Sequence, residues 1–129
     1  MKCISNVLAF NEKIYEVKVS LNNGSQNFEF KTASRRKMTD LIDYVTICST
    51  KKAEGEKIIT NNELLIAKNK NLQIGIKMSE GKKILRFDKD DPKLYADFPL
   101  IGSHNYPIVY TMNSHIFWPD EERSSIILN

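Results

Sequence analysis

Cysteine, glycine and proline are scarce in this sequence, and long hydrophobic runs are missing. The 129 residues include two cysteines, five glycines and four prolines. Cys3 and Cys48 make no disulfide framework, so a reduced cytoplasmic setting is expected. No apolar run approaches the roughly 20 residues of a membrane-spanning helix, and the apolar stretch near the start is too short for a secretory signal. We therefore expect a cytoplasmic protein without a membrane partner.

The five glycines are dispersed along the chain. A phosphate cradle needs several glycines close together before a helix, and the sequence has neither a Gly-rich loop of this kind nor a Walker motif. We therefore expect no nucleotide site, no bound cofactor and no enzymatic activity, including ATP turnover, from residues 1–129 by themselves.

The composition is that of an ordinary globular domain. Hydrophobic residues make up 41% and charged residues 27% of the chain, which suffices for one core in a single domain of residues 1–129. The formal net charge of +3 is small, and the lysines and arginines up to Lys93 are interleaved with acids. In residues 94–129, by contrast, Arg123 is the only lysine or arginine. This arginine therefore stands out.

Alternating apolar and polar residues predict strands in the first half of the chain. Residues 15–21 alternate with period two, and residues 22–25, which contain Asn-Gly, favour a tight turn into a returning strand at residues 28–30. Residues 41–48 are rich in β-branched and aromatic side chains and predict a more fully buried strand, with a helix as the less favoured alternative. Residues 58–67 also fit a strand better than a helix without caps.

A second hairpin is predicted in the middle of the chain. In residues 72–78 the apolar side chains again lie on one face, and residues 79–82 supply a glycine-containing turn into residues 83–87. Residues 88–92 are a polar break. Pro92 is then predicted to begin one helical turn that runs through Tyr95.

Prolines limit the strands near the end of the chain. Pro99 and Pro107 belong at strand starts or sheet edges, because proline cannot donate to a sheet ladder. Residues 108–112 are predicted to be the last strand. The whole pattern predicts an α+β fold dominated by an antiparallel sheet of hairpins, with little helix.

Candidate catalytic and metal-binding groups are present, but their spacing is unfavourable. No close CxxC or HxxxH-type pair exists among Cys3, Cys48, His104 and His115, so no metal site is expected. Ser103 precedes His104, but neighbours on a strand point to opposite faces and no GxSxG motif is present. The acids at residues 90–91 are interpreted as part of a solvated turn and not as a catalytic pair.

Two surfaces support binding hypotheses. Arg35, Arg36 and Lys37 follow two phenylalanines, a combination that can bind single-stranded nucleic acid, although a mobile solvated loop is the stronger interpretation. Phe117 and Trp118 are either an exposed anchor for a partner protein or a pair buried under a continuation of the chain.

The last third of the chain contains an ordered set of short motifs. In sequence order they are Phe98, Pro99 and Leu100; Pro107, Ile108 and Val109; Asn113 and Ser114; and Arg123 before Ile126, Ile127 and Leu128. This order resembles the segment that follows the nucleotide-binding domain in ATPases of the sacsin and ninety-kilodalton heat-shock chaperone type, in the GHKL superfamily. Residues 7–14 resemble the stretch that leads out of the ATPase domain in that family. Ser124 and Ser125 depart from the second arginine or Asp-Gly of many relatives.

The resemblance implies that residues 1–129 are an excised part of a larger ATPase, a partial middle or transducer-like domain. Such a module would couple an upstream ATPase domain of the same chain to a client or partner protein, while the parent protein binds ATP and Mg²⁺. Arg123 would be the cation that contacts phosphate. Two alternatives stay open. One is a stand-alone protein interaction module that uses Phe117 and Trp118 or an open strand edge, and the less favoured one is a single-stranded nucleic-acid binder.

Overall fold

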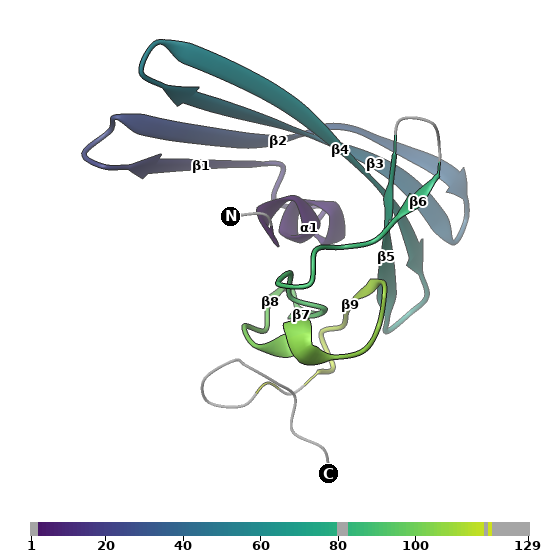
Figure 1. Ribbon diagram of the computed structural model, residues 1–129. Coiled ribbons are helices and arrows are strands. Elements are labelled where there is room, and N and C mark those ends of the chain that lie inside the picture. The colour runs from purple at the N-terminus through teal and green to yellow at the C-terminus, as the bar shows by residue number, and fades with distance from the viewer. Residues whose placement is uncertain (1–2, 80–82, 118, 120–129) are drawn as a thin grey trace.

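The computed structural model describes residues 3–79, 83–117 and 119, and in it one helix lies inside a strongly curved sheet (Figure 1). The helix is α1 (Cys3–Phe10). The strands are β1 (Glu16–Leu21), β2 (Gln26–Thr39), β3 (Ile42–Ala53), β4 (Glu56–Lys68), β5 (Gln73–Met78), β6 (Ile84–Leu85), β7 (Leu94–Ala96), β8 (Phe98–Pro99) and β9 (Thr111–Asn113), with a 3-10 turn η1 (Ser103–Asn105). The predicted fold class, dominated by antiparallel strands with little helix, is confirmed. Within the described residues, no helix combines the length and the apolar character needed to cross a membrane.

The strands form one sheet in the order β1-β2-β3-β4-β5-β9-β7-β8, and β6 also pairs with β5. All pairs are antiparallel except β7 with β9. The first five strands are an up-and-down meander, and each of them includes a segment that was predicted as a strand. At the first hairpin Asn22, Asn23 and Gly24 all have positive φ, which is the backbone conformation expected of Asn-Gly turns.

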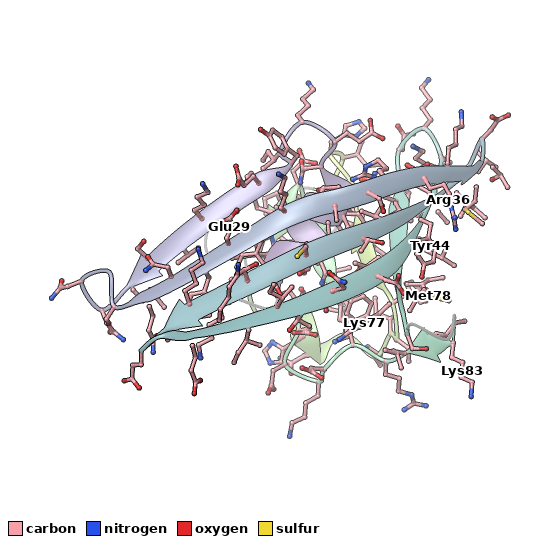
Figure 2. All side chains as sticks on the ribbon, turned by 90° about the horizontal axis from the view of Figure 1, so that it is seen from above. Glu29, Arg36, Tyr44, Lys77, Met78 and Lys83 are labelled. Atoms are coloured by element: carbon pink, nitrogen blue, oxygen red, sulfur yellow. The ribbon has the colours of Figure 1, made fainter. Side chains whose placement is uncertain are left out.

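The three central strands are long and lie side by side, as Figure 2 shows from the outer face. They have 14, 12 and 13 residues in β2, β3 and β4. A register shift between Thr32 and Ser34 interrupts β2, and bulges of this kind increase the local bend and twist of a strand. Successive side chains alternate between the outer face and the inner face, which surrounds α1.

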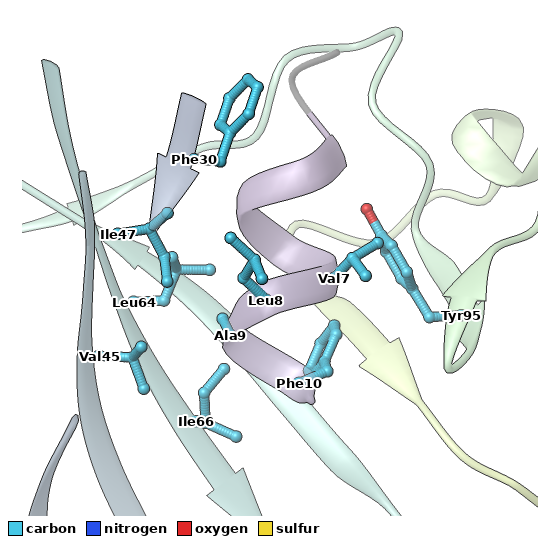
Figure 3. Packing of buried hydrophobic residues seen from close by; sticks show 10 residues of the cluster. All are labelled: Val7, Leu8, Ala9, Phe10, Phe30, Val45, Ile47, Leu64, Ile66 and Tyr95. Carbon is cyan, nitrogen blue, oxygen red and sulfur yellow. The ribbon is translucent and has the colours of Figure 1, made fainter. Parts of the chain in front are cut away.

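The core lies between α1 and the inner face of the sheet (Figure 3). Leu8 and Ala9 of α1 are fully buried, and the sheet supplies Val45, Ile47 and Leu64. An isolated helix of eight residues is marginal in water. Burial of a leucine side chain contributes about 1.5–3 kcal/mol, so α1 depends on these contacts more than on its own sequence.

Two local predictions are corrected. Residues 92–95 form no helical turn, because Leu94 already belongs to β7, and the Lys93 and Leu94 amides donate to the buried Ser103 hydroxyl at 3.1 and 3.0 Å. The last described strand is β9, which is shorter than the predicted residues 108–112 and ends at Asn113. Pro99 does lie at an edge, in β8, as expected from its missing amide proton.

Candidate functional site

Motif residues that are distant in the sequence meet in a small group of strands formed by β7, β8 and β9, here called the terminal sheet. β7 lies in the middle of this group. It pairs with β8 through Tyr95 and Pro99, and with β9 through Leu94 and Met112. The Phe-Pro-Leu motif and the Asn-Ser motif therefore lie on opposite sides of one short strand.

Asn113 fixes the turn between β7 and β8. Its side chain is buried, and its Oδ1 accepts a hydrogen bond from the Asp97 amide at 2.7 Å. Asp97 is the turn residue and has a φ of 65°, a left-handed conformation that aspartate tolerates better than most residues. The Asn113 Nδ2 donates to Gln73 Oε1 at 2.7 Å. One asparagine thus holds the turn and attaches the terminal sheet to β5.

The remaining motif residues divide into buried and exposed ones. Leu100 is fully buried and its amide donates to the Leu94 carbonyl at 2.9 Å. Pro99 is half-buried, whereas Pro107 is exposed and Phe98 is 52% exposed. Leu100 therefore has a packing role, while Phe98 and Pro107 face the solvent.

Tyr95 connects the terminal sheet to α1. Its side chain is completely buried, its hydroxyl accepts a hydrogen bond from Asn6 Nδ2 at 3.0 Å, and its ring centroid lies 5.3 Å from that of Phe10 (Figure 3). Burial raises the pKa of the Tyr95 hydroxyl well above the ordinary tyrosine range. A second link runs from Asn11 Nδ2 to the Asp97 carbonyl at 3.0 Å.

Arg35 lies in β2 and not in the loop that the sequence analysis favoured. Its guanidinium donates to the Ala9 carbonyl at 2.9 Å and to the Leu8 carbonyl at 3.2 Å. These carbonyls belong to the last turn of α1, which has no partners of its own for them. Arg35 therefore caps the C-terminus of the helix, a role that the sequence analysis missed.

The buried Asp43 pairs with two cations near the C-terminus of α1. Asp43 is 3% exposed, and its Oδ2 lies 3.6 Å from Arg35 Nη1 and 2.8 Å from Lys68 Nζ. The hydrogen bond to Asp43 raises the pKa of Lys68. Lys68 also reaches Glu12, just beyond α1, at 3.4 Å.

The predicted basic surface is divided between two faces of the sheet. Arg36 follows Arg35 in β2, so their side chains point to opposite faces. Arg36 lies 5.6 Å from the centroid of the Tyr44 ring on the outer face, where Figure 2 labels both residues. Lys37 is exposed and pairs with Asp40 at 3.3 Å. The three cations therefore do not form the continuous surface that the nucleic-acid hypothesis requires.

The other chemical candidates also have structural settings. In the part of the chain that the structure describes, no three potential ligands among histidine, cysteine, aspartate and glutamate come together as a metal site. The Ser103 hydroxyl is completely buried and accepts the two amides of the β7 segment. Asp91 closes a turn by accepting a hydrogen bond from the Asp88 amide at 3.0 Å. The turn was expected to be solvated, but Asp91 is buried.

Three sequence candidates lie at or beyond the limit of the described residues. Phe117 is half-buried, and its amide donates to the Ser114 carbonyl at 3.3 Å. Trp118 and Arg123 lie outside the described residues. Their roles in partner binding and phosphate contact stay predictions.

Comparison of the chain with known protein families, with curated proteins and with solved structures gives no match. The arrangement itself combines a helix near the start of the chain with motif residues near its end, through Asn6, Tyr95, Asn11 and Asp97. These contacts hold α1 and the terminal sheet in fixed positions relative to each other.

Proposed function

We propose that residues 1–129 form a non-catalytic, transducer-like module of an ATP-dependent, chaperone-like protein, which couples an upstream ATPase domain to partner binding. The proposal starts from the resemblance of residues 7–14 and of the motifs after residue 97 to the segment that follows the ATPase domain in such proteins. Phosphate contact by Arg123 in the parent protein is part of the same proposal.

The observation that supports this proposal most is the contact between α1 and the terminal sheet. Residues 7–10 of the first resembling segment belong to α1, and Phe10 packs against Tyr95 at 5.3 Å. Hydrogen bonds from Asn6 and Asn11 reach Tyr95 and Asp97 on the same side. Closely packed elements transmit displacement, because a dense interior resists compression. A movement imposed on α1 by an upstream domain would therefore reach the strands that precede Arg123.

ATP turnover by the longest natural reading frame that contains this segment tests the proposal. We expect Arg123→Ala to lower turnover by about 100-fold or more, because a lost cation no longer stabilises charge on the transferred phosphate. Arg86→Ala is the matched control, because Arg86 is exposed on the loop after β6, and this variant should keep turnover within about two-fold of the wild type. Circular dichroism establishes that both variants are folded.

Absence of turnover in that reading frame, or absence of any longer frame, would reject the family assignment. Equal turnover in the wild type and Arg123→Ala would favour the alternative, a stand-alone interaction module. For that alternative the terminal sheet and its following loops offer apolar side chains that are more than half exposed, namely Phe98, Ile101, Val109 and Ile116.

A further inference from the structure

The helix leaves part of the inner face of the sheet uncovered. A helix of eight residues is about 12 Å long, whereas a strand of 14 residues extends about 46 Å. In Figure 1 the ends of β1 to β4 accordingly project past α1. A cavity of about 470 Å³ lies there, and its walls come from α1, from the sheet and from the loop after β6.

The floor of this cavity is apolar. Phe28, Phe30, Ile58 and Leu64 line it from β2 and β4, and Phe87 lines it from the loop. Ile58 is 52% exposed, which is unusual for the inner face of a sheet and marks apolar area that the fold itself does not cover.

Several polar side chains of the cavity wall already have hydrogen-bond partners within the protein. Asn62 Nδ2 donates to the Ser5 hydroxyl at 3.2 Å, and the Ser49 hydroxyl donates to the Thr60 carbonyl at 3.3 Å. Because these groups already have partners, the wall attracts a ligand mainly through its apolar area and its charges.

The charges around the cavity are unbalanced. Lys51 and Lys77 line it, and no ion pair to either ammonium is found among the described residues; Lys51 Nζ lies 5.7 Å from the centroid of the Phe28 ring. On the acidic side, Asp91 accepts the Asp88 amide, and Lys93 Nζ donates to the carbonyls of both residues at 3.1 and 3.0 Å. Lys93 thus adds a third cation beside the two aspartates, and these five charged groups have a formal sum of +1, which favours an anionic ligand.

We propose that this cavity binds an amphipathic carboxylate, a small molecule with an apolar chain or ring and a single negative charge. The apolar part covers Phe28, Ile58 and Leu64, and the carboxylate pairs with Lys51 or Lys77 at the rim. The volume of about 470 Å³ falls within the range of about 300–1,000 Å³ that is typical of ligand pockets. This binding role is independent of the proposed coupling to an ATPase domain.

Calorimetric titration of the full 129-residue chain with decanoate tests the inference. We expect saturable binding of one decanoate per chain at neutral pH. Decan-1-ol has the same chain without the charge and should bind at least about five-fold more weakly, because it forms no ion pair with a lysine. Decylammonium should bind more weakly again, because its charge repels the lysines.

Adjacent residues on one strand provide matched variants. Ile58→Ser should weaken decanoate binding about ten-fold, because the ligand loses apolar contact area. Ile59→Ser is the control, since Ile59 is similarly exposed, at 60%, but points to the other face of β4. Lys51→Met should weaken binding about five-fold, and Lys52→Met, on the opposite face of β3, should not.

Thermal unfolding of each variant verifies that it is folded before titration. The inference is overturned if no saturable decanoate binding occurs below millimolar concentration, or if decan-1-ol binds equally well. Tighter binding of decylammonium than of decanoate would also overturn it, because the acids would then determine the charge preference. Equal losses in the Ile58 and Ile59 variants would show that binding occurs outside the cavity.

Discussion

Tyr95 joins the helix and the terminal sheet through one buried side chain. Its hydroxyl accepts from Asn6 and its ring packs on Phe10. Burial raises the pKa of this hydroxyl, so it stays protonated in the folded protein at pH values at which a tyrosine in the unfolded chain ionises. The stability that depends on Tyr95 is therefore complete below about pH 10 and is lost as the pH rises above that value.

Replacing Tyr95 with phenylalanine removes the hydroxyl group, and with it the hydrogen bond and the ionisation, but keeps the ring. We expect Tyr95→Phe to lower the free energy of unfolding at pH 7 by about 1–2 kcal/mol, because Asn6 loses its acceptor in a buried setting. Above about pH 10 the difference in the free energy of unfolding should shrink. Ionisation of Tyr95 stabilises the unfolded wild type, whereas phenylalanine cannot ionise. Urea unfolding at neutral and alkaline pH measures both values. Tyr15→Phe is the control at an exposed residue, and a difference that does not change with pH would contradict the account.

Asp43 illustrates how far single residues can be predicted from the sequence. Both faces of residues 41–48 carry apolar side chains, so only the face that Asp43 shares with Val45 and Ile47 was available from the pattern, and not which face is inward. Its partners were not available either, because Arg35 belongs to another strand and Lys68 is 25 residues away. Pairing between distant charges depends on strand register, which the alternation alone does not determine.

At the scale of elements, β5 passes close to both α1 and β9 at Gly75. A Cβ atom at this position would lie 2.6 Å from Thr111 Oγ1 and 3.0 Å from Cζ of Phe10. Gly75 also lies on the inner face, whereas Ile74 and Ile76 lie on the outer face and are half-buried there. The glycine thus allows three elements to meet.

Gly75→Ala should therefore disturb this junction. We expect the substitution to lower the free energy of unfolding by about 1–3 kcal/mol, because the added methyl group overlaps with Thr111 and Phe10. Thr111→Ala removes the nearest atom, so the double variant should lose less stability than the sum of the single variants. Urea unfolding of the four proteins measures this coupling. Additive losses would mean that the methyl group does not meet Thr111.

The meander elements were predictable, whereas the helix and β7 were not. Strands β1 and β5 follow local alternation, and β3 and β4 begin or end near the segments that were expected to be strands. Strand β2 is longer than predicted, because residues 35–37, which were expected in a loop, belong to it.

Helix α1 is a short apolar segment, and Asn11 after it donates from Nδ2 to the Val7 carbonyl at 2.8 Å. Arg35 of β2 supplies a second C-terminal cap, which no local pattern indicates. The predicted helical turn at residues 92–95 was wrong. This segment is a strand because of its partners β8, β9 and Ser103, which come later in the chain and are not visible in the local sequence.

At the scale of the whole molecule, the topology of the curved sheet brings α1 into contact with the terminal sheet. β9 lies between β5 and β7 and runs parallel to β7, an order that no local pattern indicates. As a result, Asn6 of α1 bonds to Tyr95, and Asn11, just after α1, bonds to Asp97. The resemblance motifs were read from the sequence, but their convergence on one strand depends on this topology.

Hydrogen–deuterium exchange on the longest natural reading frame, with and without a non-hydrolysable ATP analogue, tests the coupling most directly. The account predicts that nucleotide changes exchange in α1 and in residues 94–113 together, because α1 and the terminal sheet move as a packed unit. The turn end of the β1–β2 hairpin, residues 20–27, projects past α1 in Figure 1, so it should keep its exchange rates and serves as the internal reference. A nucleotide effect that never reaches α1 or residues 94–113, or that alters only one of them, would contradict the account.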